Sequence, residues 1–332
     1  PMLSAAAAPA PHLDSLTVAY HGPHAPPSGR LYLHTSPEFP MKRLLAAGSG
    51  SIYQLCRVFR DGEAGTRHNP EFTLLEWYRA GFELPRLIDE VEALLRAVLA
   101  GLRELPPAVH RSYRELFREY AGVDGLTAGA AELRACLEQH GHRSPPGMPD
   151  DDPDPWRDLL LTHLIEPRLR GLVFVSGYPA SQASLARIEA GDPPVAARFE
   201  CYLDGVELAN GFHELGDAAE QRRRFGLGAN GNPVFGEVYR RPATACGATL
   251  LAVDLLRDGG VVHSPAGGTH HGRRAGASGF CYFNDPVLGI LAFLDRGLTR
   301  VAYVDLDAHH CDGVEEALAG DPRVLIASVH EA

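Results

Sequence analysis

The chain has 332 residues, of which 45% are hydrophobic and 22% charged, and its formal net charge is −11. This balance is that of a globular protein, and the negative charge argues against a broad nucleic-acid-binding surface. No apolar run is long enough to span a membrane. The six cysteines are scattered without paired spacing, which predicts reduced thiols and a cytoplasmic protein. The opening segment, residues 1–13, lacks the basic start of a signal peptide and is predicted to be a flexible tail or the edge of a longer segment.

The first part of the chain mixes strands and helices. Residues 30–36, 51–60 and 71–79 each predict a strand. Apolar residues recur at helical spacing at Leu87, Ile88, Val91, Leu94, Leu95 and Val98. Residues 199–215 contain Asp204-Gly205 between two apolar runs, which predicts a β-hairpin. These elements predict an α+β domain with an antiparallel sheet core over residues 1–226.

The second part of the chain has a different pattern after the glycine-rich stretch at 226–232. We expect a strand running into a loop at 259–268, a helix at 284–297, a buried strand at 300–310, a short helix at 312–320 and a last strand at 323–329. Alternating strands and helices predict a parallel sheet in an α/β domain, here residues 227–332.

Residues 56–79 have the order strand, charged loop, strand. Arg60, Glu63, Arg67 and His68 fall in or beside the loop, where a bound phosphate chain needs cations and hydrogen-bond donors. The alternative interpretation is a hairpin that carries only surface ion pairs. The whole string CRVFRDGEAGTRHNPEFTLLEWYR resembles motif 2 of class II aminoacyl-tRNA synthetases, in particular the lysyl branch.

Three further stretches narrow that resemblance. TSPEFPMKRLLAAG at 35–48, PASQASLA at 179–186 and GVELANGFHEL at 205–215 are similar to the elongation factor P–(R)-β-lysine ligase family, over about residues 12–226. The resemblance implies that Arg60 is catalytic and that ATP is contacted by Arg60, Asp61, Gly62, Asn69, Glu207 and Leu208. It implies that the amino-acid substrate is contacted by Ser36, Pro37, Glu38, Tyr78 and Glu214.

The implied reaction is adenylation of (R)-β-lysine, or lysine, with ATP and Mg²⁺, followed by transfer to a lysine of elongation factor P. Carboxylates such as Glu38 and Glu214 suit a diamino acid because they can pair with its ammonium groups. The resemblance implies no anticodon-binding domain, and we expect motif 1, before residue 12, and motif 3, after the FHEL segment, to be missing from this sequence.

A second cluster lies in VDLDAHHCDGVEEAL, residues 304–318. Alternation along a strand would place Asp305, Asp307 and His309 on one side, at the carboxyl end where ligand sites of parallel sheets form. A carboxylate and an imidazole two residues apart suit Zn²⁺. The alternative is a strand whose polar end is merely solvated. Tandem His270 and His271, in the loop after the preceding predicted strand, are candidates for general acid–base work.

AGGTHHGRRAGASGFCYFND, residues 266–285, together with VDLDAHHCDGVEEAL, is similar to the core of the arginase-like histone deacetylase, acetoin-utilisation and acetylpolyamine amidohydrolase family, over about residues 231–332. The resemblance implies that Asp307 and His309 are zinc ligands and that His270 and His271 are acid–base histidines. It implies that Asp305 and Asp312 are their carboxylate partners, and that Phe280 lines the tunnel for an acyl-lysine. We expect the third zinc ligand and a transition-state tyrosine to be missing.

Three hypotheses follow. The first is a class II synthetase-like ligase core fused to a partial deacetylase domain, the second is a zinc-dependent hydrolase of acetyl-lysine or acetylpolyamine, and the third is a hybrid or fragment without catalytic activity.

Overall fold

The computed structural model describes residues 1–4, 13–23, 25–26, 29–65, 68–228, 232–234 and 238–330. The chain divides into two compact units, Pro1–Glu90 and Val91–Ala332. The predicted boundary between residues 226 and 227 lies inside the second unit, and it stays a prediction. In the described part of the chain, no helix is both long and apolar enough to cross a membrane. All six cysteines are described and are free thiols.

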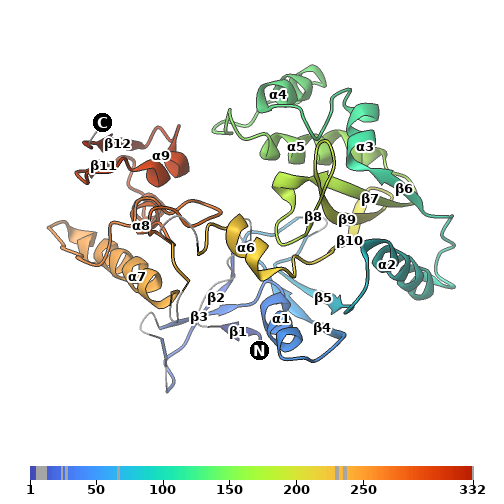
Figure 1. The fold of residues 1–332 in the computed structure, drawn as a ribbon, viewed down its shortest axis with the longest axis horizontal. Helices are drawn as coiled ribbons and strands as arrows, with labels where there is room; N and C mark the ends of the chain where they lie inside the picture. Colours follow the sequence, from blue (N-terminus) through green and yellow to red (C-terminus); the bar gives the residue numbers. More distant parts are fainter. Residues whose placement is uncertain are drawn as a thin grey trace. The chain divides into compact units, whose positions relative to one another are not determined.

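The described part of the first unit is built from short strands, the helix α1, a hairpin and the first turns of α2 (Figure 1). Its elements are β1 (Leu3–Ser4), β2 (Thr17–Ala19), β3 (Arg30–Leu33), α1 (Glu38–Ala46), β4 (Ile52–Phe59) and β5 (Glu71–Tyr78). The strands form a three-stranded antiparallel sheet in the order β1-β3-β2, and β4 pairs with β5 as predicted. Because Leu3 pairs with Leu33, the tail prediction is wrong at residues 3–4, while residues 5–12 lie outside the described part.

The β4–β5 hairpin has two unlike faces because side chains alternate along a strand. Gln54 lies opposite Glu76, and Ile52 opposite Tyr78. These residues are partly buried, whereas Tyr53 and Leu55 on the alternate face are exposed. Glu76 and Tyr78 therefore share the more buried face of the hairpin.

The long helix α2 (Leu84–Leu99) confirms the predicted helical spacing and leads from the first unit into the second. The next elements of the second unit are β6 (Val109–Ser112), α3 (Tyr113–Tyr120), α4 (Ala130–Gln139), α5 (Asp154–Leu160), η1 (Leu161–Ile165), η2 (Glu166–Arg168), β7 (Leu172–Pro179), η3 (Ala180–Gln182), β8 (Ile188–Glu189), β9 (Val195–Leu203), β10 (Val206–Phe212) and α6 (Ala218–Arg224). Their sheet has the order β10-β9-β7-β6, with β8 on β9. It is mixed, because β6 pairs parallel with β7 while the other pairs are antiparallel.

Helices α3, α4 and α5 pack together on this sheet (Figure 1). A capping box starts α3, in which the Ser112 hydroxyl accepts from the Glu115 N–H and Glu115 accepts from the Ser112 N–H. The shared core contains fully buried aromatic and aliphatic side chains, among them Tyr113, Phe117, Leu133, Trp156, Leu160, Val175 and Tyr202. This core is the largest apolar cluster described here and makes the sheet a rigid support.

The predicted hairpin at 199–215 is confirmed as β9 and β10. Its turn residues, Asp204 and Gly205, have φ angles of 50° and 77°, the left-handed pair that a two-residue hairpin turn requires. A Cβ on Gly205 would lie 2.3 Å from the Glu166 carbonyl oxygen, so only glycine fits there.

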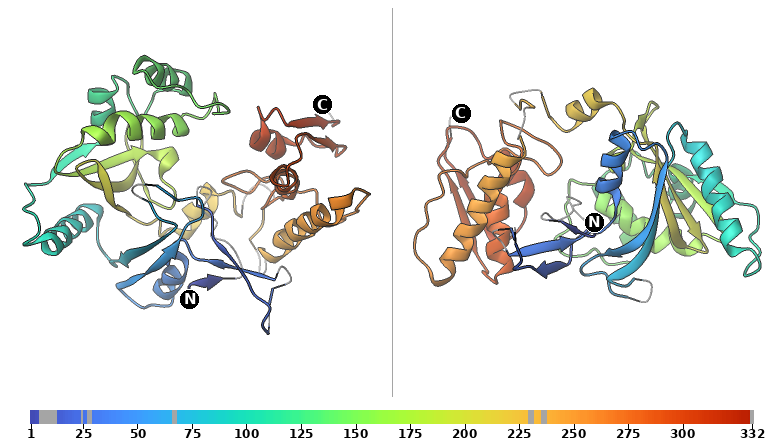
Figure 2. Two further views of the ribbon diagram at one scale, coloured as in Figure 1. Left: turned by 180° about the vertical axis from the view of Figure 1, so that it is seen from behind. Right: turned by 90° about the horizontal axis from the view of Figure 1, so that it is seen from below.

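The C-terminal segment of the second unit contains α7 (Arg240–Leu255), η4 (Leu256–Asp258), α8 (Asp285–Asp295), β11 (Val301–Asp305), α9 (Asp312–Leu318) and β12 (Val324–Ser328). β11 pairs parallel with β12, as predicted. The Asn284 side chain caps α8 and proline occupies its first turn, which confirms the helix expected at 284–297. Figure 2 shows α7 and α8 from two further directions.

Two predictions for this segment are wrong. Residues 259–264, all of them described, form no strand, and Val261 is 97% exposed. The strand predicted at 300–310 ends at Asp305 and is buried on one face only. Val301 and Tyr303 pack toward a small cluster around Ile290 and Val314, while Val304 is exposed. Parallel strands are buried on both faces only where both faces are covered, and within the described residues α8 and α9 cover one.

Candidate functional site

The residues implied to contact the amino-acid substrate in the first unit gather where α1 begins. Ser36 and Pro37 precede the helix, and the Glu38 N–H donates to the Ser36 hydroxyl at 3.1 Å. Glu38 forms an ion pair with Lys42 one turn later, with 2.7 Å between Oε1 and Nζ. This pair is of the helix-spaced kind, and both side chains are about a quarter exposed.

Tyr78 brings a second carboxylate into the same site. Its hydroxyl donates to Glu76 Oε1 at 2.8 Å. Burial raises the pKa of the Glu76 carboxyl, the Tyr78 hydrogen bond opposes this, and the negative charge of Glu38 raises it further. Two carboxylates that influence each other thus lie in one half-buried site.

Sequence reasoning missed Glu76 and Lys42. The signal for Glu76 was available, because it lies two residues before Tyr78 on one strand and must share its face. Lys42 also acts on Glu76 and helps to keep its carboxyl ionised. The cluster of Ser36, Glu38, Lys42, Glu76 and Tyr78 is called the carboxylate site below.

The residues implied to contact ATP are divided between the units. Arg60, Asp61, Gly62 and Asn69 lie on the loop between β4 and β5, in the first unit, whereas Glu207 and Leu208 lie on β10 in the second. Glu214, the remaining substrate residue, follows β10 and bridges to Ala186. The contacts described for each group are therefore those inside its own unit. Arg67 lies outside the described residues.

Arg60 is held loosely. Its Nε donates to the Thr35 carbonyl at 3.4 Å, one terminal nitrogen is 3.5 Å from Glu63, and the guanidinium lies 4.9 Å above the Phe72 ring. Distances of this length are at the outer limit of hydrogen bonding, so phosphate oxygens can replace these partners. Asp61 is anchored by its backbone to Asp14 and accepts from the Gly62 N–H at 2.9 Å. These residues fit a phosphate chain.

The tandem histidines of the second unit each pair with one of the two aspartates that the resemblance implied as their partners. His270 Nδ1 lies 2.6 Å from Asp305 Oδ2, and His271 Nδ1 lies 2.5 Å from Asp312 Oδ1. The two rings are neighbours, with 4.1 Å between their centroids. His270 and Asp305 are buried, while His271 is partly exposed.

Both aspartates are held in the ionised form that accepts hydrogen bonds from the histidines. Burial raises the pKa of the Asp305 carboxyl, but hydrogen bonds from Tyr303 and His270 outweigh burial and hold it below its usual value. Burial likewise opposes the shift at Asp312, whose pKa is lowered by His271 and by the Arg273 guanidinium. An ionised carboxylate on Nδ1 leaves Nε2 of each imidazole to exchange a proton with a substrate.

Asp307 and His309 lie beyond the end of β11, in a loop, so the predicted placement on one side of the strand is wrong for them. Asp307 Oδ1 lies 2.8 Å from His309 Nδ1 and 3.9 Å from His270 Nε2, and the His309 side chain is 76% exposed. Within the described residues, no group of three His, Cys, Asp or Glu side chains is placed to hold a metal ion. Two donors do not fit a catalytic zinc, which takes three protein ligands and a water.

Phe280 lies in the loop between the tandem histidines and α8. It is largely exposed and has a φ of 65°, unusual for a bulky residue, and its N–H donates to Asn232 Oδ1 at 2.8 Å. The preceding Gly279 lies against His271, because a Cβ there would be 2.5 Å from the ring. The implied tunnel residue thus directly follows a glycine that packs against His271.

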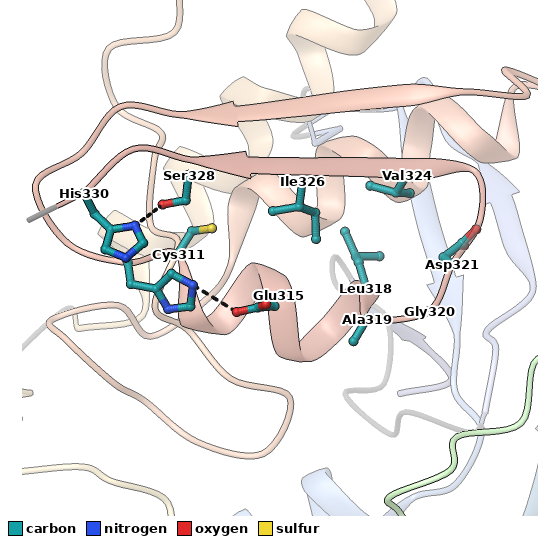
Figure 3. Close-up of a pocket in the computed structure, with 11 residues that line it drawn as sticks. Cys311, Glu315, Leu318, Ala319, Gly320, Asp321, Val324, Ile326, Ser328 and His330 are labelled. Carbon is teal, nitrogen blue, oxygen red and sulfur yellow. Dashed lines mark hydrogen bonds and ion pairs between the residues drawn. The ribbon is translucent and has the colours of Figure 1, made fainter. Parts of the chain in front are cut away.

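A cavity of about 430 Å³ lies between α9 and β12 (Figure 3). Its wall contains His310 paired with Glu315 at 2.9 Å, Ser328 bonded to His330 Nδ1 at 2.9 Å, and the buried thiol of Cys311. None of the residues implied to contact ATP, the amino acid, zinc or an acyl-lysine lines this cavity.

Comparison with known proteins matches both parts of the chain to families. The family of class II tRNA synthetases (D, K and N) matches residues 1–235, and the histone deacetylase domain matches residues 199–332. A relative from Haemophilus influenzae (strain PittGG), named elongation factor P–(R)-β-lysine ligase, is 46% identical over 218 residues, which are 65% of this chain and 65% of the relative. A relative of the same name from Pasteurella multocida (strain Pm70) is 48% identical over 216 residues, which are 64% of this chain and 65% of the relative. Another, from Haemophilus ducreyi (strain 35000HP / ATCC 700724), is 46% identical over 216 residues, which are 64% of this chain and 64% of the relative. The matched part of the chain therefore spans just under two thirds of these relatives.

Proposed function

The chain belongs to the family of class II tRNA synthetases (D, K and N), and on that premise we propose that residues 1–226 form an ATP-dependent ligase core. It activates (R)-β-lysine, or lysine, as an adenylate and transfers it to a lysine of elongation factor P in the cytoplasm. The relatives' names support the substrate and the partner, since all three are elongation factor P–(R)-β-lysine ligases.

The carboxylate site is the observation that carries this proposal. Glu38 and Glu76 provide two negative charges beside one resident ammonium, that of Lys42. A neutral amino-acid side chain would leave these carboxylates short of a partner, whereas a second ammonium group pairs with them. Tyr78 holds Glu76 in place from the same strand.

ATP and Mg²⁺, when bound, supply an activated phosphorus and partial neutralisation of its charge. Arg60 orients and stabilises the phosphate oxygens, because its present contacts are weak enough to be exchanged. The substrate carboxylate displaces pyrophosphate, and the amine of the acceptor lysine then displaces AMP to form an amide. Catalysis by positioning and charge stabilisation needs no general base with a strongly shifted pKa.

Exchange of pyrophosphate into ATP tests the proposal directly. We expect exchange that depends on (R)-β-lysine, and Arg60→Ala is expected to lower it about a hundred- to a thousandfold. Arg57→Ala is the matched control, because Arg57 lies on the same hairpin and its ion pair with Glu71 is exposed to solvent. No exchange with any lysine isomer would overturn the ligase function.

Substrate recognition has its own variants. Glu38→Gln and Glu76→Gln are expected to raise the KM for the amino acid while leaving the KM for ATP unchanged. Glu71→Gln, also on β5 but exposed, is the control. Equal effects on both KM values would show that these carboxylates support the fold rather than bind the diamino acid.

A second candidate function is hydrolysis of an acetylated amine such as acetyl-lysine or acetylpolyamine by residues 227–332. The two His–Asp pairs favour it, since they provide two imidazoles of which one can accept and one donate a proton. Zinc would be held by Asp307 and His309, which are fewer donors than a catalytic site needs. Equilibrium dialysis tests it: one zinc per chain, lost in Asp307→Asn, supports the hydrolase, and less than one zinc overturns it. A chain that fails both tests is the inactive hybrid or fragment of the third hypothesis.

A further inference from the structure

The loop that carries the tandem histidines is held by Asp285, the first residue of α8. Asp285 is buried, and it accepts hydrogen bonds from the loop at three points. Its Oδ1 accepts from the Thr269 N–H at 2.8 Å and from the Thr269 hydroxyl at 2.6 Å, and its Oδ2 accepts from the Gly268 N–H at 3.2 Å. Thr249, on α7, donates to the same Oδ2 at 2.7 Å.

The residue before it, Asn284, holds the other end of the loop. Its Nδ2 donates to the carbonyl of His270 at 3.1 Å and to that of Gly272 at 2.9 Å. Its Oδ1 accepts from the Val287 N–H at 3.1 Å and so caps α8. Because carbonyls only accept and an N–H only donates, this orientation of the amide is unambiguous. The Asn284 Nδ2 therefore holds the loop while its Oδ1 caps α8, and a substitution can remove the first function without the second.

The loop has little space in which to move. A Cβ on Gly272 would lie 2.7 Å from the Phe283 carbonyl carbon, and one on Gly313 would lie 2.6 Å from the carbonyl oxygens of His270 and Gly272. The backbone from 270 to 272 is thus enclosed between the residues that lead into α8 and the start of α9. Small changes in its path must alter the direction of both imidazoles.

We propose that Asn284 and Asp285 are positioning residues that set the orientation of His270 and His271 through the loop backbone. Asp305 and Asp312 hold the rings, and the Asn284–Asp285 pair holds the peptide groups from which those rings project. What the oriented imidazoles are used for rests on the second candidate function. The orientation itself does not depend on catalysis.

The test is an NMR measurement on the full chain that needs no substrate. Imidazole Nδ1–H groups bonded to carboxylates at 2.5–2.6 Å give proton signals far downfield of the amide region, so we expect two. Asp305→Asn and Asp312→Asn assign them to His270 and His271. Absence of both signals from the unmodified chain would overturn the paired geometry and the proposal with it.

Asn284→Asp is the decisive variant. Aspartate still accepts from the Val287 N–H and caps α8, but it cannot donate to the carbonyls of His270 and Gly272. We expect the downfield signals to broaden or disappear while the amide signals of α8 stay in place. Unchanged downfield signals would overturn the proposal. Asn210→Asp, the same change on an exposed position of β10, is the matched control and is expected to leave them unaltered.

A second variant covers the case in which Asn284→Asp fails to fold. Thr269→Val keeps the shape of the side chain and removes only the hydroxyl that donates to Asp285. It is expected to shift the His270 signal more than the His271 signal, because Thr269 adjoins His270. No shift in either signal would contradict the proposed role of Asp285. A chain without hydrolase activity gives the same readout, so failure of the second function and failure of this inference are distinguishable.

Discussion

The sheet β10-β9-β7-β6 and the strand pair β11–β12 belong to the same compact unit but are packed against hydrophobic cores of very different size. The first is covered by α3, α4 and α5 over a core of many fully buried side chains, including Tyr113, Trp156 and Leu160. The second is backed by a small cluster around Ile290, Cys311 and Val314. Its other face leaves apolar residues in solvent, with Leu306, just past β11, 78% exposed.

A motif that is easily recognised in the sequence does not by itself lie on a well-packed part of the fold. The His–Asp pairs are well formed, yet they lie on the part of the chain with the smaller core. The carboxylate site lies in the first unit, on a helix and a hairpin. Because apolar burial is the main favourable term in folding, the two regions should differ most in how often they open.

Hydrogen exchange gives the largest expected effect. Amides of β7 and β9 should exchange at least about a thousandfold more slowly than those of β11 and β12, a difference of roughly 4 kcal/mol in opening free energy. Mass spectrometry of peptides covering each strand measures this. Similar protection in the two regions would remove the basis of the comparison.

A pair of core substitutions gives the next effect. Leu133→Ala, at a fully buried position under the first sheet, should lower the free energy of unfolding by about 2–5 kcal/mol. Leu318→Ala, in the small cluster, should leave the main transition in urea in place and speed only local exchange around β12. Equal shifts of the urea midpoint would mean that the two regions unfold together.

Two glycines with similar positive φ angles distinguish the cost of backbone strain from the cost of a steric clash, because only Gly205 is crowded. Gly205→Ala should cost about 3 kcal/mol, at the upper end for a residue forced to positive φ, because its Cβ would meet the Glu166 carbonyl at 2.3 Å. Gly297→Ala, after α8, has a φ of 90° but open space, and should cost about 1 kcal/mol. Thermal unfolding of both variants measures this, and equal costs would contradict the close approach at the hairpin.

The smallest expected effect is a pH dependence of substrate affinity in the carboxylate site. The pKa of Glu76 is raised above its ordinary value of 4.5, so its charge is complete above the raised pKa and is lost as pH falls through it. As the pH is lowered, affinity for a diamino acid should therefore begin to fall before pH 4.5 is reached. Below the raised pKa, the affinity should fall by up to about tenfold for each pH unit. Calorimetric titration from pH 8 to 5 measures this, and Glu76→Gln should remove the dependence. A dependence that persists in Glu76→Gln would assign it to another group.

Local patterns in the sequence determined much of this protein. The Asp204-Gly205 turn, a helix over the apolar positions from Leu87 to Val98 and the capped start of α8 follow from spacing and capping residues alone, and each is confirmed. The resemblance implied that Asp305 and Asp312 are the carboxylate partners of the tandem histidines, and each aspartate is hydrogen-bonded to one of them. These features depend on residues close together in the sequence, or on motifs long enough to identify a family.

Tertiary structure decided what depends on neighbours. Residues 259–264 are apolar enough for a strand but form none, because a strand needs a partner for its backbone and cover for its side chains. Asp307 and His309 match the residues of a zinc site, yet they lie past the end of β11 and pair with each other. Glu76 gained its role in the carboxylate site from the helix beside its strand, through Glu38 and Lys42. Residue type and spacing decide what a side chain can do, whereas burial and the charges around it decide what it does.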